Sequence, residues 1–207
     1  MEGKTNLNFW NRFSGLYDIF IKKSNKAYTQ MYSFIYSRVD QSMDVLELAT
    51  GTGLISLAIA DKAKSIEATD FSPKMIEVAK KKSIPRNVNF SVQDACNLLY
   101  ADCSFDCVII SNALHVMPDP GLALENIRRV LKNDGVLIAP VFTHTDNNGN
   151  EKLKAKLMEL FGFRVFHKWT SEQYYKFLED GGFNIEFTSV LKSEFPLTYV
   201  EATKALG

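Results

Sequence analysis

The central part of the chain alternates between short apolar runs and segments in which apolar residues recur at helical spacing. Val45–Leu48 and Phe105–Ser111 are nearly continuous apolar runs, which is typical of strands buried on both faces of a sheet. Leu54–Ala60 and Leu122–Leu131 carry apolar residues at the spacing of helices that pack on such a sheet. Strands that alternate with helices in this rhythm predict right-handed βαβ units and a parallel sheet.

Three further strands extend this pattern. They are expected over residues 65–70, 88–92 and 136–141, the last of them after a turn at Asn133-Asp134-Gly135. Ser72 is expected to cap the helix that follows the second strand, with Pro73 as its first residue. Lys80–Lys82 would then lie in the last turn of that helix, where cations complement the helix dipole.

The last third of the chain predicts a different arrangement. Its expected elements are helices over residues 151–161 and 171–178 and strands over residues 183–190 and 195–206. Ser171 is the expected cap of the second helix, and Gly181-Gly182 its stop. The two strands would form a terminal antiparallel hairpin. Together the patterns predict an α/β fold, a doubly wound, mostly parallel, Rossmann-like sheet of seven strands with helices on both faces.

Residues 1–40 carry two aromatic stripes at helical spacing. The first consists of Phe9, Phe13, Leu16, Tyr17 and Phe20, and the second of Tyr28, Met31, Tyr32, Ile35, Tyr36 and Val39. A polar break, Lys22–Asn25, separates them. The stripes predict two helices that pack on the sheet, form a lid over a pocket at its edge, or do both.

Composition narrows the class of protein. The chain has 207 residues, 46% of them hydrophobic, with 24 basic and 24 acidic residues. This balance predicts one globular domain and argues against a broad nucleic-acid surface. No apolar run is long enough for a membrane span, and the first residues lack the apolar core of a secretory signal. Cys96, Cys103 and Cys107 match no common zinc spacing, so we expect reduced thiols, no metal site and a cytoplasmic location.

A glycine turn follows the first strand of the predicted sheet. Gly51 and Gly53 stand between the strand and a helix, where glycines let a ligand approach the backbone closely. Asp70 ends the second strand, where a carboxylate can accept hydrogen bonds from both hydroxyl groups of a ribose. The strand, turn, helix and acid together predict a nucleotide-type pocket.

Two acids and a missing glycine bear on which nucleotide fits. Ser56 occupies the place of the third glycine in the fingerprint of dinucleotide-binding proteins. Glu47 lies inside the first strand, where a carboxylate suits a ligand with an ammonium or sulfonium group better than a pyrophosphate. Asp94 ends the third strand, within reach of an exocyclic amine of adenine. An NAD-dependent reductase is the weaker alternative, and the chain lacks the Tyr-x-x-x-Lys pair that many such enzymes carry.

Five segments in order resemble the class I S-adenosylmethionine-dependent methyltransferases. They are Glu47–Gly53, Asp70–Met75, Gln93–Ala95, Phe105–His115 and Leu131–Gly135. The resemblance is close over residues 44–140, looser in the terminal hairpin and weak in residues 1–40. It is greatest for the small-molecule branch that includes quinone-ring and phospholipid-headgroup methyltransferases. Ala49 and Thr50 stand where the family usually has Asp or Gly, and Ala49 is small enough to leave the turn open.

The resemblance implies S-adenosylmethionine as cofactor and a role for each matched residue. Gly51, Gly53 and Ala49 would lie against the methionine and ribose parts, with Glu47 orienting the turn and the ammonium. Asp70 would hold the ribose hydroxyls. Phe71, Met75, Asp94 and Ala95 would surround the adenine, and Ser111, Asn112 and His115 would lie near the methyl group. Tyr17 resembles a tyrosine that closes over the methionine end in some members. The resemblance also divides the single domain into a helical cap (1–40), a cofactor-binding core (44–141) and substrate-side helices with the hairpin (142–207).

The catalytic demands of such an enzyme are small. Methyl transfer from a sulfonium is an in-line displacement, so a base is needed only if the acceptor must lose a proton. His115 is the first candidate, followed by His144 and then His167. The expected partner is a small-molecule acceptor. Nucleic acid is not expected, because Ser111–Leu114 replaces the Asn-Pro-Pro-Tyr type motif of amine-modifying DNA enzymes. A protein that binds the cofactor without transferring its methyl group remains an alternative.

Overall fold

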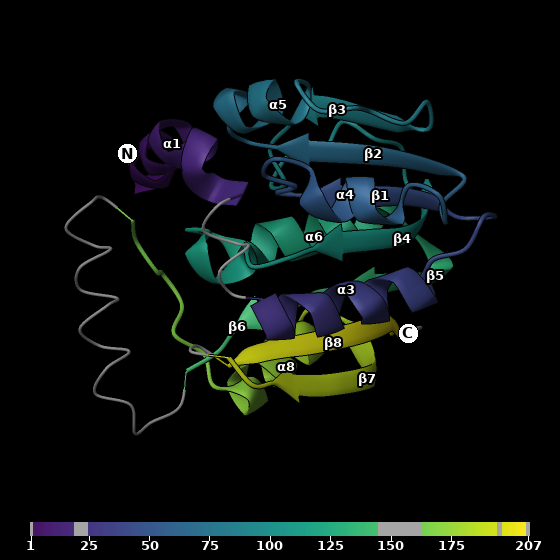
Figure 1. The fold of residues 1–207 in the computed structure, drawn as a ribbon. Coiled ribbons are helices and arrows are strands. Elements are labelled where there is room, and N and C mark those ends of the chain that lie inside the picture. The colour runs from purple at the N-terminus through teal and green to yellow at the C-terminus, as the bar shows by residue number, and fades with distance from the viewer. Residues whose placement is uncertain (1, 19–24, 145–162, 194–195, 206–207) are drawn as a thin grey trace.

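A computed structural model describes residues 2–18, 25–144, 163–193 and 196–205 (Figure 1). The strands are β1 (Asp44–Leu48), β2 (Ser65–Asp70), β3 (Val88–Val92), β4 (Phe105–Ile110), β5 (Leu131–Ile138), β6 (Val141–Phe142), β7 (Phe183–Leu191) and β8 (Leu197–Lys204). The helices are α1 (Glu2–Phe13), α3 (Asn25–Arg38), α4 (Leu54–Ile59), α5 (Pro73–Ala79), α6 (Pro120–Val130) and α8 (Ser171–Asp180), with short 3-10 helices η1 (Ser14–Leu16) and η2 (Leu114–Val116).

Within the described residues, eight strands form one sheet in the order β3-β2-β1-β4-β5-β8-β6, and β7 pairs with β8. The pairs from β3 to β5 are parallel, whereas β8 is antiparallel to β5, β6 and β7. The doubly wound sheet and its terminal hairpin are therefore as the sequence predicts. The additional strand arises at Pro140, which has no amide hydrogen to donate. The expected fifth strand stops at Ile138, and β6 resumes after the proline along the same strand, β8.

The alternation of side chains along the strands divides the core into two layers. Val45 packs with apolar residues of α3, α4 and α5 on one face. Leu46, the next residue, packs with α6 and α8 on the opposite face. In Figure 1, α3 and α4 lie in front of the sheet. Because both faces are covered, the carboxyl-end edge of the parallel strands is left for a binding site, as in other open α/β sheets.

Most expected elements appear close to their predicted limits, but several details are wrong. The cap of α8 is Thr170, which forms a capping box with Gln173, and not Ser171. The lysine triplet follows α5, with Lys80 as its C-cap. The predicted turn at Asn133–Gly135 lies inside β5, beside a register irregularity between β4 and β5. The helix predicted over 151–161 lies outside the described residues.

The aromatic stripes of the N-terminal part are only partly buried. The second stripe faces the core at Tyr28, Met31, Ile35 and Val39. Tyr36 is 38% exposed, and its hydroxyl donates to an Asp61 carboxylate oxygen at 2.9 Å. Leu16 is 58% exposed, and Phe20 lies outside the described residues. Among those residues, no helix combines the length and the apolar character that crossing a membrane requires.

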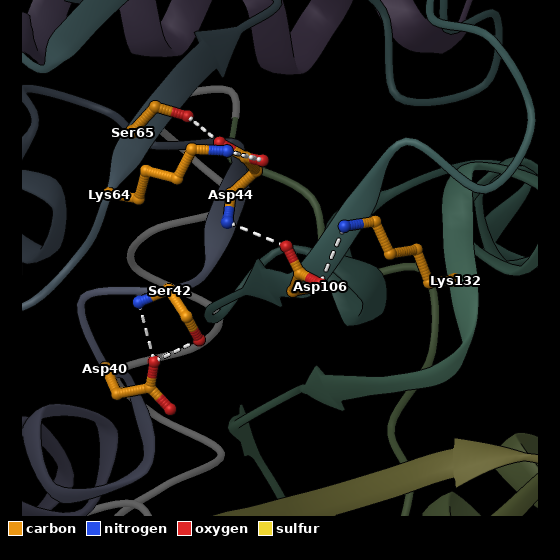
Figure 2. Close-up of polar contacts among 7 residues, drawn as sticks. All are labelled: Asp40, Ser42, Asp44, Lys64, Ser65, Asp106 and Lys132. Carbon is orange, nitrogen blue, oxygen red and sulfur yellow. Dashed lines mark hydrogen bonds and ion pairs between the residues drawn. The ribbon is translucent and has the colours of Figure 1, made fainter.

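A polar network closes the amino ends of the strands, opposite the expected site (Figure 2). The Asp44 amide donates to Asp106 at 2.9 Å, and Lys132 pairs with the other oxygen of Asp106 at 2.7 Å. Lys64 and Ser65 contact the Asp44 carboxylate at 2.7 and 2.6 Å. The hydrogen bond from Lys64 is the first cause that lowers the pKa of Asp44. Both carboxylates are thus bound by neighbouring residues of the sheet, and they hold the amino ends of the strands together. We therefore assign this edge of the sheet a structural role.

Candidate active site

A cavity of about 770 Å³ opens at the carboxyl ends of the parallel strands. Its size lies toward the upper end of the range of about 300–1,000 Å³ typical of small-molecule sites, which leaves room for a cofactor and a second ligand. Every residue that the sequence predicted for cofactor binding lines this cavity, except Glu47 and Gly53. Residues from distant parts of the sequence complete the wall, among them Trp10, Ser72, Phe142 and Phe163.

The glycine turn and the end of β2 are joined by hydrogen bonds to one carboxylate. Asp70 accepts from the Gly51 amide at 2.8 Å and from the Ser72 amide at 2.8 Å. Gly51 has φ of +58°, a conformation that glycine adopts without strain. Burial raises the pKa of Asp70 to about 6, although both amides favour its ionised form. The carboxylate is thus fixed at the cavity wall.

Glu47 and Gly53 stabilise the glycine turn and do not line the main cavity. The buried Glu47 carboxylate accepts from the amide of Ser56 at 2.9 Å and also from the Ser56 hydroxyl. Burial raises its pKa to about 7. Gly53 has φ of +79°, and an added Cβ would lie 2.4 Å from the Phe90 ring. Glu47 lines a small adjoining pocket that shares Ala49 and Asn112 with the main cavity, so its predicted contribution to ammonium binding stays a prediction.

The adenine side of the predicted site comes from the loops after β2 and β3. Met75 is buried, whereas Phe71 is 50% exposed at the cavity. Asp94 accepts a hydrogen bond from the Cys96 amide at 2.9 Å, and Ala95 is buried beside it. The structure therefore brings together the acid, the apolar surfaces and the backbone that the sequence assigned to adenine.

Asn112 holds the end of β4 in an uncommon backbone conformation. Its φ is +52°, which is costly for a residue other than glycine and tends to occur at functional sites. Its amide nitrogen atom Nδ2 donates to the Tyr28 hydroxyl at 3.2 Å, and its backbone amide donates to the Pro140 carbonyl at 2.8 Å. Its Oδ1 is buried and has no hydrogen-bond partner among the described residues. A ligand in the cavity can supply that partner.

His115 lies in η2 and is only 6% exposed. Its carbonyl accepts from the amides of Phe166 and His167, both at 3.0 Å, while its Nδ1 has no partner in the described part of the chain. Burial, followed by the charges of His144 and His167, lowers the pKa of His115 to about 3. The imidazole is therefore neutral near pH 7 and presents an unsatisfied ring nitrogen. His144 also lines the cavity, and His167 does not.

Polar contacts hold the N-terminal cap over the site. Asn6 donates to the carbonyls of Val116 and Arg164 at 2.8 and 3.0 Å, and Ser72 donates to Asn11 at 2.6 Å. In Figure 1, α1 lies beyond the carboxyl ends of the strands, near α5. The Tyr17 ring covers the glycine turn, 3.4 Å from the position of a Cβ on Gly51.

The cap contributes an aromatic wall to the cavity, which we define as Phe9, Trp10, Phe13 and Phe163. The Phe9 and Phe163 rings are 5.0 Å apart, and the Trp10 and Phe163 rings 5.5 Å. All four line the cavity. The aromatic stripe predicted Phe9 and Phe13, and the neighbouring Trp10 could have been added on the same grounds. Phe163 has no sequence signal, because only the tertiary structure brings it to α1.

The fold and this site define a doubly wound α/β domain of the nucleotide-binding type. Residues 46–139 match the family described as methyltransferase domain. A demethylmenaquinone methyltransferase of Staphylococcus aureus is 32% identical over 170 residues, which are 76% of this chain and 67% of that protein. The chain belongs to the class I S-adenosylmethionine-dependent methyltransferases.

Two further comparisons describe the extent of the likeness. A demethylmenaquinone methyltransferase of Paenarthrobacter aurescens is 41% identical over 100 residues, which are 48% of this chain but 39% of that protein. The chain therefore spans about two fifths of this relative and about two thirds of the Staphylococcus aureus relative. The structure of Burkholderia thailandensis 1,6-didemethyltoxoflavin-N1-methyltransferase, with bound 1,6-didemethyltoxoflavin and S-adenosylhomocysteine, has a TM-score of 0.74 at 16% identity. It covers 99% of this chain and 90% of that one, and it supports the fold.

Proposed function

We propose that this protein transfers a methyl group from S-adenosylmethionine to a small-molecule acceptor. The observation that carries the proposal is the Asp70 carboxylate, fixed by the Gly51 and Ser72 amides at the wall of a cavity large enough for two ligands. Family membership and the bound S-adenosylhomocysteine of the Burkholderia thailandensis enzyme support the cofactor assignment. The domain division, the small-molecule partner and the cytoplasmic location that the sequence predicted belong to the same proposal.

The residues of the cavity fit such a cofactor. Asp70 would accept hydrogen bonds from the ribose hydroxyl groups. Phe71 and Met75 would lie against the adenine ring, and Asp94 and Ala95 would lie at its edge. Gly51, Ala49 and Tyr17 would enclose the methionine part. The unpartnered Oδ1 of Asn112 is an acceptor suited to an ammonium group or to the polarised methyl group.

The protein's own contribution to the reaction is alignment and exclusion of water. The cofactor supplies an activated methyl group, which an acceptor atom attacks in line with the departing sulfur. The aromatic wall shields the cavity, and Ser111, Asn112 and His115 lie where the fourth strand ends. Because the pKa of His115 is about 3, the neutral ring is a weak base. We therefore propose that His115 orients the methyl acceptor rather than acting as a base: its Nδ1 would accept a hydrogen bond from that molecule.

Calorimetry and turnover together test the proposal. Titration with S-adenosylmethionine, S-adenosylhomocysteine and NADH should show binding of the first two only. Transfer of a labelled methyl group should then be measured over a panel of phenols, amines, thiols and quinols, since the quinone-biosynthesis relatives make quinols a natural member. Cofactor binding without transfer to any acceptor would favour a binding protein. Binding of NADH in place of the adenosyl compounds would contradict the proposal.

A further inference from the structure

Charge is unevenly distributed along the cavity. Asp70 and Asp94 line the end that we assign to adenosine, and Asp119 also lines the cavity, with its carbonyl accepting from the Cys96 thiol at 3.5 Å. Lys26 and Lys192 line the same cavity. The proposed cofactor carries a sulfonium, an ammonium and one carboxylate group, and that carboxylate belongs to the methionine part, which we assign to Ala49, Gly51 and Tyr17, so cations elsewhere in the cavity are not needed for the cofactor. The two lysines therefore point to a different ligand.

The fold places both lysines at the acceptor side of the cavity. Lys26 is in the first turn of α3, two residues before Tyr28, whose hydroxyl contacts Asn112. Lys192 directly follows Leu191, which pairs with Leu197 on β8, and Leu197 also pairs with Phe142 on β6.

Phe142 connects this region with the predicted reaction centre. Its ring centre is 6.2 Å from that of Tyr28 and 6.4 Å from that of His115. The lysines thus lie in segments next to Tyr28 and Phe142, the two rings that adjoin Asn112 and His115.

Both lysines are available to a ligand. Across the part of the chain that the structure describes, their ammonium groups form no ion pair or hydrogen bond, whereas Lys82 and Lys132 are both paired. Lys26 and Lys192 are exposed at the cavity, whose lining also includes the apolar aromatic wall and the polar residues His144 and Ser193. Apolar walls weaken solvent screening, so an anion near these ammonium groups is attracted more strongly than in open water.

We propose that the methyl acceptor is an amphiphilic acid, with an apolar, ring-sized body against the aromatic wall and a carboxylate or phosphate bound by Lys26 and Lys192. This inference rests on the proposed methyl transfer and specifies its acceptor. The acid is a recognition group: it fixes one end of the acceptor, so that the body lies between His115 and the methyl group. Transfer itself forms the bond from the acceptor atom to the methyl carbon and breaks the bond from that carbon to sulfur, whose electron pair stays on S-adenosylhomocysteine; a proton on the acceptor atom leaves to water.

Matched probes test the charge requirement. Protein saturated with S-adenosylhomocysteine is titrated by calorimetry with 2-naphthoate, 2-naphthyl phosphate and the neutral 2-naphthamide. At least one anion should bind about tenfold or more tightly than the amide, as expected for charge-assisted hydrogen bonds. The tighter of the two anions identifies the acid as carboxylate or phosphate. The preference should shrink at high salt.

Variants locate the effect. In the double variant Lys26→Ala/Lys192→Ala the anion preference should disappear, while affinity for S-adenosylhomocysteine stays within about twofold. Lys80→Ala removes an exposed lysine at the end of α5 that does not line the cavity and should retain the preference.

Three results would overturn the inference: equal binding of 2-naphthamide and both anions, no binding of either anion, or a double variant that loses S-adenosylhomocysteine instead. The last would assign the lysines to the cofactor carboxylate. Failure of the proposed function is distinguishable, because the wild-type protein would then either not bind S-adenosylhomocysteine or transfer no methyl group to any acceptor in the turnover assay.

Discussion

The backbone amide of Gly51 donates a hydrogen bond of 2.8 Å to the Asp70 carboxylate. This contact joins the turn after β1 to the end of β2, two elements that are also paired in the sheet. The acid proposed to hold the ribose and the turn proposed to hold the methionine part are therefore one preorganised unit. Such preorganisation lowers the cost of ordering the site when a ligand binds.

Replacement of Asp70 by Asn should weaken S-adenosylhomocysteine binding by about tenfold or more, because charge-assisted hydrogen bonds to the ribose are lost. The pKa of about 6 adds a pH dependence. Below pH 6 the carboxyl group is mostly protonated and must lose that proton before it can accept hydrogen bonds from both ribose hydroxyl groups. The affinity of the wild type for S-adenosylhomocysteine should therefore fall as the pH is lowered from 7 to 5. Calorimetry over that range checks this, and Asp70→Asn should lack the dependence. Equal affinity of variant and wild type at pH 7 would remove the ribose assignment.

Glu47 should make the wild-type protein less stable as the pH rises. Its folded pKa is about 7, against 4.5 ordinarily, so between these values the folded state binds more protons than the unfolded state. The stability that protonated Glu47 contributes is full below pH 4.5 and is lost as the pH rises through 7. Since one pKa unit corresponds to about 1.4 kcal/mol, the upper limit is about 3 kcal/mol.

The uncharged variant Glu47→Gln isolates this effect. Thermal unfolding at pH 5 and pH 8 should show that the stability of the variant relative to the wild type increases as the pH rises, because glutamine does not ionise. Its amide oxygen can still accept the hydrogen bond from Ser56. Parallel pH profiles for the two proteins would contradict the assignment.

Gly53→Ala should destabilise the protein by at least about 2 kcal/mol, through positive φ and overlap with a packed ring. An added Cβ would lie 2.4 Å from Phe90, at a backbone φ of +79°. Gly15→Ala is the matched control, since a Cβ added there would meet no atom within 4 Å. That control should stay within about 0.5 kcal/mol of the wild type. Chemical denaturation measures both, and equal midpoints would show that the turn relaxes freely.

Lys82 should help to hold the N-terminal cap in place. It pairs with Asp18 at 2.7 Å and donates to the Thr52 carbonyl at 2.9 Å, while the Thr52 hydroxyl donates to Asp18. Lys82→Met should lower S-adenosylhomocysteine affinity by about three- to tenfold, because Tyr17 is no longer held over the turn. Hydrogen exchange of residues 2–18 should rise in parallel. Lys80→Met is the control, and unchanged exchange in Lys82→Met would argue that the cap is held by its other contacts.

His115→Ala should lower turnover by about tenfold or more while S-adenosylhomocysteine affinity stays within about twofold, as expected for a group that orients the acceptor. Because its pKa is about 3, wild-type turnover should show no loss from imidazole protonation between pH 8 and pH 5. Steady-state rates across that range, with calorimetry on both proteins, give the comparison. If His115→Ala turns over normally, the acceptor is positioned by other groups.

Much of the central sheet was predictable because its pattern is local. Ser65–Asp70 and Val88–Val92 have the predicted limits, and Ser72 caps α5 ahead of Pro73 as expected. Such signals act over a few residues, through backbone hydrogen bonds and side-chain alternation. Predictions that depended on distant partners were less accurate: Tyr36 lies outside the core because its hydroxyl contacts Asp61 instead.

By itself, the sequence determined the alternation of strands and helices from β1 to β5, the glycine turn and the acids at the strand ends, since each follows from short-range chemistry. Only the tertiary structure decided that Glu47 binds Ser56 rather than lining the main cavity, that Phe163 contacts Trp10, and that Lys26 and Lys192 line the same cavity. The contact between Glu47 and Ser56 depends on how α4 folds back beside β1, whereas the other two relationships join residues far apart in the chain, which only the packing of the whole fold brings together.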